Sequence, residues 1–215
     1  MELIAKNVSK VIHRKAILSD VNLSLHSGNI YGFVGRNGSG KTMLFRALSG
    51  LMSVSTGEIT WDGKVLRKDF SVLPSLGIII ENVGLYPSLT GIENLRYLAS
   101  LTRRVGEPEL RDAICRVGLD PDDKRPYRKY SLGMKQRLAI AQAVMECPDV
   151  IMLDEPTNAL DEEGVTRIRQ LILEEKKRGA LILLASHNRE DIRILTDCLY
   201  RIENGFVSGL EEGEP

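Results

Sequence analysis

Hydrophobic residues along the chain form two kinds of pattern. Short apolar runs, often rich in β-branched residues and bounded by turn residues, are typical of strands. These runs stand at residues 3–5, 17–25, 30–34, 57–64, 77–81, 150–153, 180–185 and 199–207. Longer runs with helical spacing stand at residues 43–51, 90–102, 107–117, 131–146 and 162–178, and a short helix is expected after His187. The alternation of the two kinds predicts an α/β fold.

Local start and stop signals agree with these assignments. Thr90 and Glu93 have the spacing of a capping box at the start of one helix. Gly179 is suited to end another helix, and Asn204-Gly205 predicts a hairpin turn. The predicted elements therefore have defined boundaries.

The middle of the chain differs from its two ends. Only helical patterns are found at residues 82–147, whereas strands and helices alternate on either side. We therefore expect a single domain over residues 1–215, with a core of residues 1–81 and 148–215 and an all-α insertion at 82–147. The first strands, joined by a short charged turn, predict an N-terminal antiparallel β region.

A phosphate-binding pattern lies between the predicted strand 30–34 and the helix that begins near Lys41. It matches G-x-x-x-x-G-K-[ST] in the strand–loop–helix context that the pattern requires. Its glycines allow main-chain N–H groups to approach an anion, and the helix directs its positive dipole end at the same point. Lys41 is expected to reach the β- and γ-phosphates of ATP, and the Thr42 hydroxyl to ligate Mg²⁺. The expected binding residues are Gly35, Arg36, Asn37, Gly38, Ser39, Gly40, Lys41 and Thr42.

Two carboxylates follow the apolar run 150–153. Side chains alternate along a strand, so Asp154 and Glu155 face different directions. This geometry suits a division of roles, in which Asp154 holds Mg²⁺ and Glu155 activates the attacking water. The pair alone is equally consistent with a solvated strand end. Together with the phosphate loop it predicts a P-loop NTPase core, a mostly parallel sheet flanked by helices.

Composition limits the possible functions. The chain has 29 basic and 29 acidic residues, so no overall field favours nucleic acid or an anionic membrane. Its three cysteines are widely spaced and are expected to be buried, reduced thiols. The N-terminus does not resemble a signal peptide, and no apolar run approaches the ~20 residues that cross a bilayer. We therefore expect a soluble cytoplasmic chain, whose membrane role, if any, comes through a partner.

Further motifs resemble those of ATP-binding-cassette (ABC) ATPases. The segment Tyr130-Ser131-Leu132-Gly133-Met134 is similar to the Leu-Ser-Gly-Gly-Gln signature of that family. The segments 154–157 and 158–161 and then His187 follow in the family's order. The resemblance covers nearly the whole chain.

This resemblance implies that two cassettes dimerise head to tail. Each ATP then lies between one subunit's phosphate loop and the other's signature, so a second copy or a paralogue is required. Ser131 and Gly133 would contact the partner's γ-phosphate, Asp161 would cross the interface, and His187 would hold the γ-phosphate with Glu155. Taken alone, His187 would more readily be interpreted as a buried, hydrogen-bonded core histidine, and its place in the motif order reverses that interpretation.

Several positions depart from the family pattern. Glu81 stands where the family commonly has a glutamine before the helical insertion. A glutamate keeps an oxygen ligand for Mg²⁺ but lacks the amide donor. The alternative is that the substitution is neutral. Leu132 and Met134 replace glycine and glutamine in the signature. Ile12 stands where an aromatic residue stacks on adenine, and Asn158 replaces a serine.

The signature variant and the segment 80–87 are similar to cassettes of bacitracin-resistance and lantibiotic-immunity exporters. Leu85-Tyr86-Pro87 would either receive a permease helix or pack the insertion onto the core. The leading hypothesis is therefore an exporter ATPase, peripheral on the inner face of the membrane through a separately encoded permease. The alternatives are an ATP-gated clamp for DNA repair or the ribosome, or a regulatory module that does not hydrolyse ATP. The exported substrate, the direction of transport and the identity of the dimer partner stay open.

Overall fold

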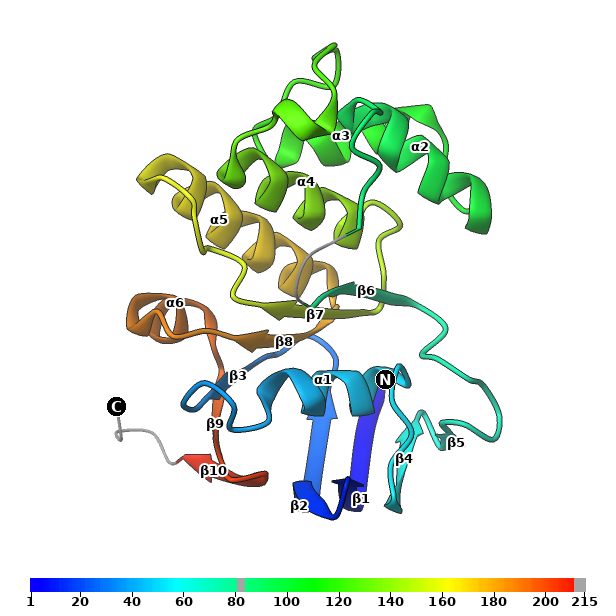
Figure 1. The fold of residues 1–215 in the computed structure, drawn as a ribbon, viewed down its shortest axis with the longest axis vertical. Coiled ribbons are helices and arrows are strands. Elements are labelled where there is room, and N and C mark those ends of the chain that lie inside the picture. Colours follow the sequence, from blue (N-terminus) through cyan, green and yellow to red (C-terminus); the bar gives the residue numbers. More distant parts are fainter. Residues whose placement is uncertain (81–83, 211–215) are drawn as a thin grey trace.

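The computed structural model describes residues 1–80 and 84–210. Two sheets and a helical region are stacked along the long axis of the molecule, with the larger sheet in the middle (Figure 1). The smaller sheet is antiparallel, with the strand order β2-β1-β4-β5. Its strands are β1 (Glu2–Ile12), β2 (Lys15–His26), β4 (Thr56–Trp61) and β5 (Lys64–Val65).

The larger sheet has the strand order β10-β9-β3-β8-β7-β6 and is parallel except for the C-terminal hairpin. Its strands are β3 (Ile30–Val34), β6 (Leu76–Ile79), β7 (Val150–Asp154), β8 (Leu181–Ala185), β9 (Cys198–Glu203) and β10 (Phe206–Leu210). The helices are α1 (Lys41–Ser49), α2 (Gly91–Thr102), α3 (Glu107–Arg116), α4 (Leu132–Val144), α5 (Glu162–Arg178) and α6 (Arg189–Leu195), and a 3₁₀ turn, η1, spans Tyr127–Lys129.

Residue alternation along the central strands separates two hydrophobic cores. On β8, Leu181 and Leu183 enter the core shared with α1 and the antiparallel sheet, whereas Ile182 and Leu184 enter the core shared with α4 and α5. These strands are buried on both faces, which explains their continuous apolar sequences. Their carboxyl ends, at Asp154 and Ala185, therefore lie side by side in the middle of the sheet.

The expected α/β fold is confirmed, with its mostly parallel sheet, its N-terminal antiparallel sheet and its helices between β6 and β7. The capping box of α2 is formed, because the Thr90 side chain accepts from the Glu93 N–H and Glu93 accepts from the Thr90 N–H. The division into a core of 1–81 and 148–215 and an insertion of 82–147 stays a prediction. In the described ranges, no helix is both long and apolar enough to cross a bilayer.

The expectation of buried cysteines is wrong. Each thiol stands at an exposed position in α3, in the turn before β7, or at the start of β9: Cys115, Cys147 and Cys198. All three are free thiols. Cysteine is a small apolar residue that is often buried, but its position in the tertiary structure decides its exposure.

Candidate functional site

The phosphate loop connects β3 to α1 at the carboxyl end of the central sheet. Gly38 and Gly40 have φ angles of 77° and 116°, in the left-handed region that favours glycine. A Cβ at Gly35 would lie 2.3 Å from the Ile202 carbonyl oxygen, so the loop also depends on close packing. The backbone is therefore shaped in the way an anion-binding loop before a helix requires.

The turn of the C-terminal hairpin is hydrogen-bonded to this loop. The Gly205 N–H donates to the Ser39 carbonyl at 3.1 Å, and the Ser19 N–H donates to the Gly205 carbonyl at 2.9 Å. The turn between β9 and β10 thus joins the phosphate loop to β2. The sequence predicted this turn but did not indicate its contact with the loop.

Lys41 begins α1 and is buried. Its ammonium group donates to the carbonyl oxygens of Gly35, at 2.6 Å, and Arg36, at 3.3 Å. Burial lowers the pKa of Lys41, and the charges of Asp154 and Glu155 partly oppose that shift. The cation is therefore held beside the loop, among the oxygen atoms of its own main chain.

Thr42 and Asp154 meet although 112 residues separate them. The Thr42 hydroxyl donates to Asp154 Oδ2 at 2.7 Å. A hydroxyl and a carboxylate oxygen at the edge of a phosphate loop fit a hard cation such as Mg²⁺, which takes its other ligands from water and substrate phosphates. Among the described residues no group of three His, Cys, Asp or Glu side chains forms a metal cage. The third predicted ligand, Glu81, lies outside the described residues.

Glu155 directly follows β7 and has a φ of 52°, in the left-handed region. Its carboxylate accepts from the His187 main-chain N–H at 3.2 Å, and its other oxygen, Oε1, lies 3.4 Å from the His187 ring. Oε1 is buried and has no hydrogen bond. Burial raises the pKa of Glu155, while the His187 contacts lower it to a smaller extent. This is the environment of a carboxylate suited to accept a proton.

His187 follows β8, and its side chain is 48% exposed, so it is not a buried core histidine. Its Nε2 lies 2.8 Å from Asn37 Oδ1 of the phosphate loop. The imidazole therefore bridges the loop and Glu155 at the edge where the phosphates of a nucleotide are expected.

Three predicted site residues lie at other helix starts. The side chains of Ser131 and Asp161 cap α4 and α5, where they accept from the Met134 and Gly164 N–H groups at 3.1 and 3.0 Å. Within residues 1–80 and 84–210, no hydrogen bond or ion pair joins Ser131, Gly133 or Asp161 to residues 35–42. Leu132, at the start of α4, is 69% exposed. The chain therefore brings together one half of the predicted site and leaves the other half facing outward.

Gln136 makes a connection that the sequence did not assign. Its side-chain amide donates to the main-chain carbonyls of Glu155, at 3.3 Å, and Pro156, at 3.1 Å. It stands about one turn inside α4, in the helix that Ser131 caps. The helix is thus fastened to the segment that carries the candidate base.

The segment Leu85-Tyr86-Pro87 packs in part onto the core, and its contact with a permease helix stays a prediction. Leu85 is buried in the core shared by the helical region and the sheet. Tyr86 is 47% exposed and makes an edge-to-face contact with Tyr97 of α2, at a ring separation of 4.9 Å. Leu85 therefore packs the segment against the core, whereas Tyr86 and Tyr97 lie at the surface.

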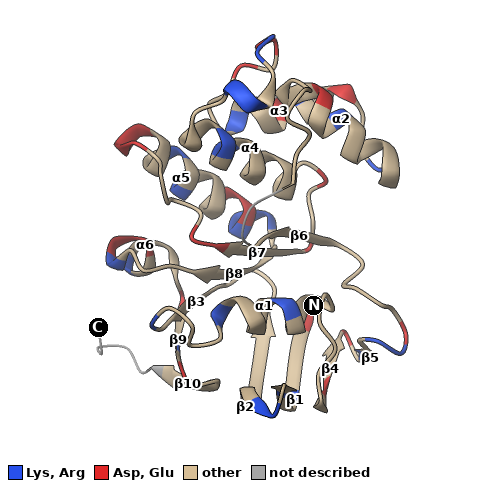
Figure 2. Cartoon of the chain, viewed as in Figure 1, with Lys and Arg blue, Asp and Glu red and all other residues tan. Residues whose placement is uncertain are grey.

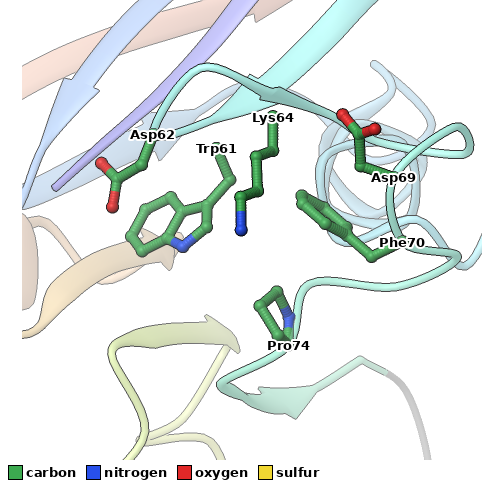
Figure 3. A pocket seen from close by; sticks show the side chains of 6 residues that line it. All are labelled: Trp61, Asp62, Lys64, Asp69, Phe70 and Pro74. Carbon is green, nitrogen blue, oxygen red and sulfur yellow. The ribbon is translucent and has the colours of Figure 1, made fainter.

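An open hollow of about 520 Å³ lies away from these groups, beside β4 and β5. Side chains of mixed character surround it (Figure 3): Trp61, Asp62, Lys64, Asp69, Phe70 and Pro74. None of them belongs to the predicted nucleotide site.

Known proteins are similar to this chain in sequence and in fold. Residues 18–158 match the family model described as ABC transporter. An uncharacterised ABC transporter ATP-binding protein of Bacillus subtilis, YybJ, is 46% identical, with 96% of this chain and 94% of that protein covered. The lantibiotic transport ATP-binding protein SrtF of Streptococcus pyogenes is 35% identical, with 94% and 87% covered.

The bacitracin transport ATP-binding protein BcrA of Enterococcus faecalis is also 35% identical, with 94% of this chain and 66% of that protein covered. A bacterial ABC transporter cassette, MJ0796, solved as a dimer, has a TM-score of 0.86 at 23% identity, with 97% and 99% covered. The structure of MJ0796 in a post-hydrolysis state, bound to ADP and Pi, has a TM-score of 0.85 at 22% identity, which shows that the fold is shared. The chain therefore belongs to the ABC transporter family, as an ATP-binding protein.

Proposed function

We propose that this chain hydrolyses ATP with the help of Mg²⁺ and powers a separately encoded permease that exports peptide antibiotics or similar compounds. One observation carries the hydrolytic part of the proposal. Glu155, with its raised pKa, and His187 lie together at the edge of the phosphate loop. A nucleotide-binding module that only senses ATP has no need of a proton acceptor at that place.

Each residue has a distinct role in this proposal. Main-chain N–H groups of residues 35–42 and the Lys41 ammonium group bind the phosphates. Thr42 and Asp154, with Glu81, would hold Mg²⁺, which offsets the negative charge of the phosphates. Glu155 accepts the proton of the attacking water, and its raised pKa makes it a stronger base than an exposed glutamate. His187 would donate to the γ-phosphate.

We further propose that a second cassette completes the site. Within the described residues the start of α4, with Ser131 and Gly133, makes no hydrogen bond to its own phosphate loop, and helix N-termini bind anions. MJ0796, which shares the fold, was solved as a dimer. In such a dimer Asp161 would lie at the interface, and Ser131 would contact the partner's nucleotide.

The export role rests on the family and on the relatives SrtF and BcrA, whose names assign them to lantibiotic and bacitracin transport. Basic and acidic residues are interspersed over the helices and strands (Figure 2), and the formal net charge is zero. This distribution does not favour a clamp on DNA or the ribosome. The chain would act in the cytoplasm, bound to the membrane through its permease.

Nucleotide binding and turnover test the hydrolytic proposal. Lys41→Ala should abolish ATP binding, whereas Lys64→Ala, in the hollow of Figure 3, should bind as wild type does. Glu155→Gln should bind ATP, lose turnover and accumulate as a dimer on gel filtration. Tight binding by Lys41→Ala or undiminished turnover by Glu155→Gln would contradict the assigned roles.

Mixing two inactive variants tests the shared site. Lys41→Ala removes the phosphate contact, and Ser131→Glu places a negative charge at the start of α4, where it opposes the partner's phosphates but suits the helix dipole. Neither variant alone should hydrolyse ATP. In a 1:1 mixture half of the dimers hold one intact site, so about a quarter of the wild-type activity should return. No recovery would show that the site does not form between subunits.

Recovery of partners from cells tests the transport role. The tagged chain, extracted from membranes in mild detergent, should bring down a multi-span membrane protein. Recovery of ribosomes or DNA in its place would favour the clamp.

A further inference from the structure

A fully buried carboxylate lies behind the candidate site. Asp191, on α6, has no exposed surface. Its Oδ1 accepts from the Arg169 guanidinium of α5 at 2.7 Å, and its Oδ2 accepts from the hydroxyls of Thr157 and, at 3.4 Å, Ser186. A buried charge without partners is very costly, so this carboxylate depends on all three.

The two hydroxyls belong to the two segments that carry the chemistry. Thr157 follows Glu155 by two residues and directly precedes the segment 158–161 that is expected at the subunit interface. Ser186 directly precedes His187, and its oxygen also accepts from the Asn188 N–H at 3.0 Å. One carboxylate oxygen thus receives a hydrogen bond from each of these segments.

The stability of the fold does not by itself explain a buried ion pair at this place. Replacement of a buried ion pair by packed apolar residues is often neutral or stabilising, so stability alone does not account for the pair. The carboxylate instead fixes distance and direction between the loops, because hydrogen bonds to its two oxygens weaken steeply when a donor is moved away or misaligned.

We propose that Asp191 is a positioning residue for ATP hydrolysis, which holds His187 and the segment after Glu155 in a fixed relation through Ser186 and Thr157. This role rests on the proposed function, since it concerns the same reaction. A displacement of segment 157–161 at the interface reaches His187 through one buried carboxylate. The same link makes turnover in one subunit sensitive to contact with the other.

Asp191→Asn tests the role, because it keeps the side-chain size and removes the charge. At saturating ATP kcat should fall about 100-fold, as a misplacement of about 1 Å in a reacting group produces, while KM changes less than about threefold, because ATP binding uses residues 35–42. Glu175→Gln is the matched control. Glu175 is 2% exposed on α5 and pairs with Arg116 and Arg178, and no hydrogen bond or ion pair within 1–80 and 84–210 joins it to the site. It should keep the wild-type kcat.

A double variant separates positioning from simple destabilisation. Asp191→Asn leaves the Arg169 charge without its buried partner, and Asp191→Asn with Arg169→Gln removes both charges. The unfolding temperature should recover in the double variant, whereas kcat should stay low. Recovery of both together would overturn the proposal, as would a single variant with a kcat within about threefold of Glu175→Gln.

Smaller changes serve if Asp191→Asn does not fold. Thr157→Val and Ser186→Ala each remove one hydroxyl, and each should lower kcat about 10-fold with little change in KM. Unchanged kcat in both would overturn the proposal. Wild-type turnover is measured first: a wild type without turnover refutes the proposed function, whereas normal wild-type turnover with unaffected variants refutes only the positioning role.

Discussion

The hairpin turn behind the phosphate loop allows a sharp test of how that loop is held. Gly205 has a φ of 82° and lies against β2, and a Cβ there would stand 2.5 Å from the Ile17 carbonyl oxygen. Gly63, in the turn between β4 and β5, has a φ of 76° and open space around its Cβ position. Gly205→Ala and Gly63→Ala therefore share the cost of the left-handed backbone and differ in the clash.

The difference between the two variants follows from these contacts. A left-handed alanine costs about 1–2 kcal/mol at either position. Only at residue 205 must the turn also move, which weakens the hydrogen bonds from Ser19 and to Ser39, at about 1 kcal/mol each. Gly205→Ala should thus lose about 2 kcal/mol more than Gly63→Ala, or about 4–8 °C in Tm for a chain of this size.

Nucleotide affinity shows whether the turn matters to the site. A shift of the Ser39 carbonyl changes the loop that we propose binds the phosphates, so Gly205→Ala should raise the Kd for ATP about 10-fold, which is about 1.4 kcal/mol. Calorimetric titration at a temperature where both variants are folded measures this. Equal Kd values for Gly205→Ala and Gly63→Ala would refute the inference that the turn supports the loop.

Three other features can be tested in the same way. The folded-state pKa of Glu155 is raised, so its ionisation destabilises the fold above that pKa and has no cost below the unfolded-state pKa. Glu155→Gln should therefore have a higher Tm than wild type at about pH 8, and this advantage should shrink as the pH falls to about 5. A Tm difference that does not change with pH would contradict the raised pKa. Thr90→Ala should cost about 1 kcal/mol in urea unfolding through loss of the cap without changing the Kd for ATP. A thiol reagent should modify three cysteines in the native chain, whereas modification only after denaturation would contradict their exposure: Cys115, Cys147 and Cys198.

Local signals made most of the fold predictable. The helix from Glu162 to Arg178 was predicted with both ends, because Asp161 caps its first turn and Gly179, at a φ of 100°, ends it. The run 150–153 was predicted as a buried strand because it is continuously apolar, and its four side chains are at most 1% exposed. Signals of this kind need no knowledge of distant residues.

The first strand shows the limit of predicting strand boundaries from local signals. The sequence predicted a strand at residues 3–5, but β1 extends to Ile12. A bulge between Ala5 and Val8 interrupts the alternation, and Asn7 has a φ of 50°. Its side chain donates to Asp20 on β2 at 2.9 Å. The irregularity is thus stabilised by the neighbouring strand, which the pattern of residues 3–12 does not contain.

The residues of the candidate site could be proposed from the sequence by type, but their contacts could not. Lys41, Thr42 and Asp154 stand in recognisable motifs. The contact between Asn37 and His187 joins residues 150 positions apart. It depends on the pairing of β3 with β8, in which Phe33 lies opposite Ala185. Register of this kind follows from the assembled sheet.

The amide of Gln136 gives α4 a fixed point close to one end. Ser131 stands five positions before it, so the start of the helix extends about 7.5 Å beyond the attachment. A tilt of this end by about 20° relative to the attachment would move Ser131 by about 2.6 Å, nearly the length of a hydrogen bond. The Gln136 side chain therefore ties the helix end that we propose contacts a neighbour's nucleotide to the main chain of Glu155, the proposed base.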